Sequence, residues 1–63
     1  MALRAARKTS GKTQAQVARE AKISEAQYQN IEYGKSEPNV RTAIRIASAL
    51  GVKSYTDFTK LFG

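Results

Sequence analysis

The sequence predicts an all-α fold in the form of a compact bundle of five short helices. Helix start and stop signals recur at close spacing along the chain, and the segments between them are rich in residues that favour helices. No segment shows the alternation of apolar and polar residues that is typical of a strand. With 63 residues, the chain is expected to form a single domain spanning residues 1–63. Because it has neither Cys nor His, we expect no disulfide and no His- or Cys-ligated metal to stabilise it.

Two helices are predicted in the first third of the chain. The first covers residues 1–8, and Gly11 supplies a stop. Thr13 begins the second helix, because Thr13 and Gln16 have the spacing of a capping box. One side of this second helix carries positions at i, i+3, i+4 and i+7, namely Gln14, Val17, Ala18 and Ala21.

A third helix follows the second almost without a linker. Ser24 and Gln27 repeat the capping-box spacing, and Gly34 ends the helix. Only Lys22 and Ile23 separate it from the second helix. The two helices are therefore expected to be joined by a tight turn.

The last third of the chain predicts two more helices. Asn39 can cap a fourth helix that ends at Gly51, and Ser54 with Asp57 opens a fifth. The fourth helix is expected to bury an apolar stripe formed by Val40, Ala43, Ile46, Ala47 and Leu50.

The charge of the chain indicates a polyanionic partner. Eleven Lys and Arg residues against five acidic residues give a net charge of +6. This density favours nucleic acid first and an anionic membrane second, although a merely well-solvated surface is the alternative interpretation. No apolar run approaches the roughly 18 residues of a membrane span, so we expect a soluble, cytoplasmic protein.

The second and third helices together indicate a helix-turn-helix, in which residues 24–33 form the recognition helix in the major groove. At 100° per residue, Tyr28 and Ile31 fall on the inner face of this helix. Its outer face carries amides where a solvated helix usually carries Lys and Glu pairs, although amides also occur on ordinary solvent faces. The outward positions are Glu25, Ala26, Gln29, Asn30 and Tyr33.

Three segments support this interpretation in order and at the right spacing. "TQAQVAREAKIS" has a Gln that opens the second helix and a Val-Ala pair inside it. "IEYGKSEPNV" and "IASALGV" follow. Together they resemble the Cro and phage-repressor family of helix-turn-helix proteins, also called the xenobiotic-response-element family, from Leu3 to Val52. The resemblance implies a lambda-repressor-like bundle that binds double-stranded DNA.

The resemblance also implies roles for individual residues. Arg7 and Glu32 match a pair that forms a buried salt bridge in relatives, so Glu32 is expected to be structural. The base-reading positions match Glu25, Ala26, Gln29 and Asn30. The positions that contact the DNA backbone match Gln14, Ser24, Gln27, Tyr33 and Lys35, and Lys22 in the turn can gain a phosphate.

Three features depart from the family pattern. Lys22 stands where the turn usually has a Gly in the left-handed conformation, which costs very roughly 1 kcal/mol. Tyr28 replaces a small aliphatic residue, so its hydroxyl is expected to reach an edge of the core or find a partner. The segment "KSYTDF" is about one residue longer than the usual approach to the fifth helix.

The proposed DNA residues differ in what they can recognise. Gln29 or Asn30 can pair bidentately with adenine, Glu25 can accept from cytosine N4, and Ala26 can contact a thymine methyl. Four cations are expected to neutralise phosphates instead: Lys12, Lys22, Lys35 and Arg41.

A single recognition helix covers few base pairs, so a homodimer on a palindromic operator is expected, with half-sites about one turn apart. The candidate interface is formed by Tyr55, Phe58, Leu61 and Phe62. Core packing is the alternative for Phe58 and Leu61, and a dimerising segment beyond Gly63 is the alternative for the whole interface.

No catalytic constellation is visible, so we expect neither an enzyme nor a cofactor, and no small-molecule ligand is evident. The function expected is that of a transcriptional regulator, most simply a repressor. An antitoxin of a toxin–antitoxin pair and a protein-interaction adaptor on the same fold remain the alternatives.

Overall fold

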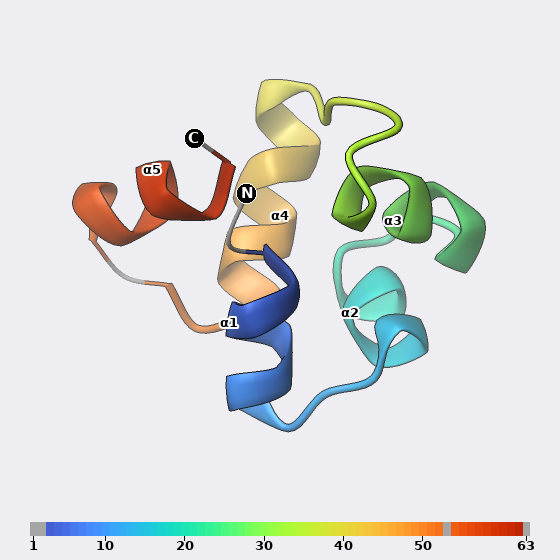
Figure 1. Cartoon of the computed structure of the whole chain (residues 1–63), viewed down its shortest axis with the longest axis horizontal. Helices are drawn as coiled ribbons and strands as arrows, with labels where there is room; N and C mark the ends of the chain where they lie inside the picture. Colours follow the sequence, from blue (N-terminus) through green and yellow to red (C-terminus); the bar gives the residue numbers. More distant parts are fainter. Residues whose placement is uncertain (1–2, 53, 63) are drawn as a thin grey trace.

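The computed structural model describes residues 3–52 and 54–62 and contains five helices in those ranges. Figure 1 shows α4 running through the middle of the molecule, with α5 on one side and α2 and α3 on the other. The predicted all-α fold is confirmed. No helix in the described ranges is long and apolar enough to cross a membrane. The helices are α1 (Leu3–Ser10), α2 (Gln14–Glu20), α3 (Glu25–Glu32), α4 (Val40–Ala49) and α5 (Tyr55–Phe62).

Side-chain caps begin four of the five helices where the sequence predicts them. The box before α2 is complete, because Thr13 Oγ1 accepts from Gln16 N at 3.1 Å and Gln16 Oε1 accepts from Thr13 N at 2.9 Å. Ser24 Oγ accepts from Gln27 N at 3.0 Å, but the Gln27 side chain returns no bond within the described ranges. The second predicted box is therefore only half formed. Asn39 and Ser54 cap the remaining two helices.

Three helices end in the same Schellman arrangement, with a left-handed residue just after the helix. Gly34 and Gly51 hold this position after α3 and α4, with φ of 77° and 75°. Lys22 holds it after α2 with φ of 62°, and among the described residues no other non-Gly residue has positive φ. Ile23 N donates to Ala18 O at 3.0 Å, which closes the motif and turns the chain into α3.

The core draws at least one large side chain from each of the first four helices. The largest fully buried ones are Leu3 from α1, Val17 from α2, Tyr28 and Ile31 from α3, and Ile46 from α4. Truncating a buried residue of this size costs about 2–5 kcal/mol. Since α3 contributes two of the five, the core holds its inner face firmly.

In α4 the predicted apolar stripe is wrong at one end. Val40, the first residue of α4, is 75% exposed, whereas Ala43, Ile46 and Ala47 from the same predicted stripe are buried. Leu50 is half-buried and packs against the core. The buried face of α4 is instead formed by Thr42, Ala43, Ile46, Ala47 and Ala49.

The last helix packs against α1 and α4. Leu61 is buried and belongs to the core, so it offers no free surface. Phe58 and Phe62 are half-buried, and their ring centroids lie 5.3 Å apart. The side chain of Tyr55 lies outside the described part of the structure.

Candidate nucleic-acid interface

The geometry of the proposed site begins with the packing of α2 against α3. Val17, Ala18 and Ala21 bury one side of α2, and Tyr28 and Ile31 bury the inner side of α3. The tight turn through Lys22 fixes the direction in which α3 leaves α2. The outer side of α3 is therefore presented to solvent on a rigid support.

The four residues predicted to read bases lie on this outer side. Glu25, Ala26 and Asn30 are exposed, and Gln29 is half-buried. Of these four side chains, the described ranges give a hydrogen bond only to Gln29, whose Nε2 donates to Gln14 Oε1 at 3.2 Å. The carboxylate and amide groups of Glu25 and Asn30 are thus available to external donors and acceptors.

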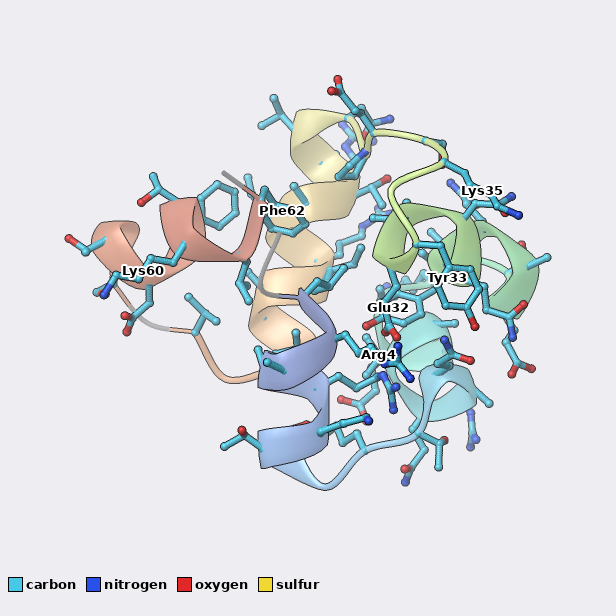
Figure 2. The ribbon with its side chains drawn as sticks, in the orientation of Figure 1. Arg4, Glu32, Tyr33, Lys35, Lys60 and Phe62 are labelled. Atoms are coloured by element: carbon cyan, nitrogen blue, oxygen red, sulfur yellow. The ribbon has the colours of Figure 1, made fainter. Side chains whose placement is uncertain are left out.

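Gln14, at the start of α2, joins α2 to α3 through its amide. Its Nε2 donates to Glu32 Oε1 at 3.2 Å and lies 3.4 Å from the hydroxyl of Tyr33. Figure 2 shows Glu32 and Tyr33 together at the end of α3 that faces α1 and α2. The Oε1 atom of the same amide accepts a hydrogen bond from Gln29 Nε2. Gln14 therefore orients Gln29 with respect to the end of α3.

An ion pair holds α1 against the end of α3. Arg7 Nε donates to Glu32 Oε2 at 2.8 Å and Arg7 Nη2 to Glu32 Oε1 at 3.2 Å, with side-chain exposures of 13% and 0%. Burial opposes ionisation of Glu32, but the hydrogen bonds and charge of Arg7, together with the nearby Tyr28 hydroxyl and the Gln14 amide, outweigh it and lower the pKa of Glu32. The hydrogen bond that Arg7 donates to Glu32 also raises the pKa of Arg7. Glu32 is thus an internal anion whose carboxylate is held by Arg7 and Gln14.

The hydroxyl of Tyr28 lies close to this ion pair. This hydroxyl is buried, and no hydrogen bond of good geometry reaches it from the described residues, although the carboxylate of Glu32 and the guanidinium of Arg7 lie close to it. Burial, together with the neighbouring carboxylate of Glu32, raises the pKa of Tyr28. A neutral phenol therefore lies on the buried, inner side of α3.

The residues predicted to contact the DNA backbone surround α3. Lys22 lies before its first turn and Lys35 after its last, and both are exposed. Tyr33 is 54% exposed, and Figure 2 shows Tyr33 and Lys35 on the same side of the molecule. Ser24 and Gln27 are also exposed, although the Ser24 hydroxyl is already bonded to the backbone of Gln27. Cationic and hydrogen-bonding groups thus lie at both ends of α3.

Lys12, which the sequence predicts at a phosphate, makes two bonds inside the fold. Lys12 Nζ donates to Glu20 Oε1 at 2.6 Å and to the carbonyl oxygen of Ala49 at 2.6 Å. Its own carbonyl accepts from Arg7 Nη1 at 3.0 Å. Lys12 therefore joins the end of α2 to the last turn of α4. No local sequence pattern indicates this link, because its partners lie 8 and 37 residues away.

The described residues hold no group of three or more side chains that could bind a metal ion. What they do present is a polar helix face with cations at both ends.

Comparison with known protein families gave one match. A family model described as "Helix-turn-helix" matches residues 3–57, which is most of the chain and includes α1 to α4 and the start of α5. A search of curated proteins and a search of solved structures found no match.

Proposed function

The chain belongs to the helix-turn-helix family of the Cro and phage-repressor type, and from this membership we propose that it recognises a specific double-stranded DNA sequence through the outer face of α3. The family is one of DNA-binding regulators.

The observation that carries the proposal is the chemistry of α3. Its outer face combines the free carboxylate of Glu25, the free amide of Asn30 and the oriented amide of Gln29. These groups match the donors and acceptors of base edges in the major groove, which is wide enough to admit a helix. A face intended only for solvent would not need one of its amides to be oriented by a neighbouring helix.

Each base-reading residue has a preferred partner. We assign adenine to Asn30 or Gln29, cytosine N4 to Glu25 and a thymine methyl to Ala26. The backbone contacts come from Lys22, from Lys35 and from the polar groups around them: Gln14, Ser24, Gln27 and Tyr33. A bidentate base contact discriminates by about 1–3 kcal/mol, whereas phosphate contacts act on every sequence alike.

We further propose that the protein acts as a homodimer on a palindromic operator and represses transcription by occupying it. One α3 covers only a few base pairs, so two copies on half-sites about one helical turn apart supply the length that a unique site requires. Phe58 and Phe62 remain the candidates on α5 for contact between copies, because Leu61 is buried. No enzymatic step is part of this proposal.

Selection of bound duplexes from a random pool, at low and at near-physiological salt, tests the proposal. We expect enrichment of a palindrome whose half-sites contain the bases assigned above. Binding that enriches no sequence and vanishes at the higher salt would overturn it, because a net charge of +6 alone attracts DNA in that manner.

A further inference from the structure

A second arginine of α1, Arg4, lies one turn before Arg7 on the same flank of the helix. Residues three positions apart on a helix are neighbours, with Cβ atoms about 5–6 Å apart. Arg7 is used inside the fold, where it donates to Glu32 and to the carbonyl oxygen of Lys12. Arg4 is exposed, and the described ranges give it neither a hydrogen bond nor an ion pair. Its guanidinium therefore carries a charge and N–H donors that no described residue uses.

The side chain of Arg4 points toward the end of α3. Figure 2 shows it extending from α1 to the region where Glu32 and Tyr33 lie, with Lys35 farther along on the same side of the molecule. Lys60, on α5, lies on the other side of α4 (Figure 2). Arg4 is thus directed at the edge of the surface that the proposed function assigns to DNA.

The carboxylate of Glu32 is satisfied without Arg4. Both of its oxygens accept from Arg7, and Oε1 also accepts from Gln14. The charge of Arg7 balances that of Glu32, so Arg4 leaves this corner of the molecule with a net positive charge. Like charges one turn apart on a helix repel and slightly destabilise it. A cation held in this position without an internal partner points to an anion outside the fold.

We propose that Arg4 is a further DNA-backbone residue, which neutralises the phosphate beside Gln14 and Tyr33 when α3 occupies the major groove. This inference rests on the proposed function and extends its site to α1. The first helix then has two roles, because Arg7 fixes the end of α3 and Arg4 binds the DNA strand next to it.

The groups next to Arg4 can bond a phosphate but cannot neutralise it. Gln14 and Tyr33 are uncharged, and Gln14 Nε2 already donates to Glu32 and lies 3.4 Å from the Tyr33 hydroxyl. Arg7 is bound to Glu32. Much of the affinity of a phosphate contact comes from the counterion that a protein cation releases. Arg4 supplies the charge that this contact requires.

The guanidinium group of Arg4 suits a phosphate better than a base in this place. It is planar and always charged, and its paired N–H donors match two oxygens of one phosphate. Base edges are reached by the helix inside the groove, which is α3, whereas Arg4 projects from α1 at its side. We therefore expect Arg4 to strengthen binding to every sequence alike.

Salt titrations of binding to a random-sequence duplex test the role of Arg4. Each phosphate contact adds about 0.9 to the slope of log affinity against log salt. Between about 50 and 200 mM salt, the wild type should therefore lose about three- to fourfold more affinity than Arg4→Gln. Gln favours helices about as well as Arg does, so α1 should persist, and thermal unfolding verifies that the variant is folded.

Two further variants serve as controls. Lys60→Gln removes the same charge from the other side of α4 and should keep the wild-type slope. Arg4→Lys keeps the charge but loses the paired donors, so it should keep the slope and bind more tightly than Arg4→Gln. A wild-type slope in Arg4→Gln would overturn the inference. Equal reductions of the slope in Arg4→Gln and Lys60→Gln would overturn it too, because only the total charge would then matter.

Selection of an operator separates this inference from the proposed function. A wild-type chain that binds the random duplex but enriches no sequence would contradict the proposed function, and the salt titrations would still decide the role of Arg4. A chain that enriches an operator, with the same salt slope in the wild type and Arg4→Gln, would keep the function and overturn the inference. Failure of the wild type to bind any duplex would overturn both.

Discussion

Gln29 donates from Nε2 to Oε1 of Gln14 over 3.2 Å, and Nε2 of Gln14 donates over 3.2 Å to the carboxylate of Glu32. The carboxylate is fixed in turn by two bonds from Arg7. A residue proposed to read bases is thus connected through α2 to an ion pair between α1 and the end of α3. The orientation of Gln29 is built into the fold before DNA arrives.

Gln14→Ala tests the value of that orientation. Without its partner, Gln29 must be ordered when DNA binds, and we expect affinity for the selected operator to fall about three- to tenfold, the worth of one ordinary hydrogen bond. Affinity for a random duplex should change by less than about twofold, since it depends mostly on charge. Titrations of both duplexes at one salt concentration measure the two losses. Equal losses would show that Gln14 acts only as a phosphate contact.

The Arg7–Glu32 ion pair predicts a dependence of stability on pH. Because the folded protein lowers the pKa of Glu32, this carboxylate contributes stability that is present above its unfolded pKa of about 4.3 and is lost as pH falls through the lower folded value. Urea unfolding followed between pH 7 and pH 2 should show this loss. In Glu32→Gln, part of the acid-dependent slope should disappear. An identical slope in the variant would show that other carboxylates cause the acid sensitivity.

Lys22→Gly should separate stability from DNA affinity. The residue after α2 has φ of 62°, a conformation that disfavours Lys by roughly 1 kcal/mol relative to Gly, so we expect a higher melting temperature. The same substitution removes a cation beside α3, and the slope of log affinity against log salt should become shallower by about one unit. Thermal unfolding and a salt titration on the operator measure the two effects. Gly11→Ala, at another left-handed position away from α3, should destabilise the fold without altering the salt slope.

Tyr28→Phe should stabilise the fold. The substitution removes a buried hydroxyl without a partner while keeping the ring, and an unsatisfied buried polar group costs about 1–3 kcal/mol. We therefore expect the free energy of unfolding to rise by about 1 kcal/mol in urea titrations. Tyr33→Phe is the matched control, and its stability should stay within about 0.5 kcal/mol because that side chain is largely exposed. A fall in the stability of Tyr28→Phe would mean that the hydroxyl is satisfied after all.

Local signals explain most of what the sequence predicted correctly. Thr13, Ser24 and Asn39 bond within three residues of themselves, so their role as caps is encoded next to them. The left-handed conformation of Lys22 was implied by the family resemblance rather than by a local signal, and the structure confirms it with φ of 62°. The base-facing and phosphate roles on and around α3 remain predictions, because no DNA contact tests them.

The exposure of Val40 and the internal bonds of Lys12 depend instead on contacts between residues far apart in the sequence. Val40 is exposed because the buried arc of α4 is centred on Ile46, and which arc is buried depends on where α2 and α5 pack. Lys12 was expected at a phosphate because a lone surface Lys resembles any other in sequence. Its partner, the carbonyl of Ala49, is a backbone atom that no side-chain pattern reveals. Contacts across the fold decided both cases.

Lys12→Met tests whether this residue belongs to the fold or to the DNA contact. Lys12 bonds both Glu20 and the last turn of α4, so its loss should lower the free energy of unfolding by about 1–2 kcal/mol. Because two of the three N–H donors of its ammonium group are already used inside the fold, the salt dependence of DNA binding should hardly change, whereas Lys35→Met should reduce the salt slope by about one unit. Glu20→Gln keeps the bond to Ala49 and breaks only a largely exposed ion pair, so it should cost less than about 1 kcal/mol. A Lys12→Met protein of unchanged stability and reduced salt slope would return Lys12 to the phosphate contacts.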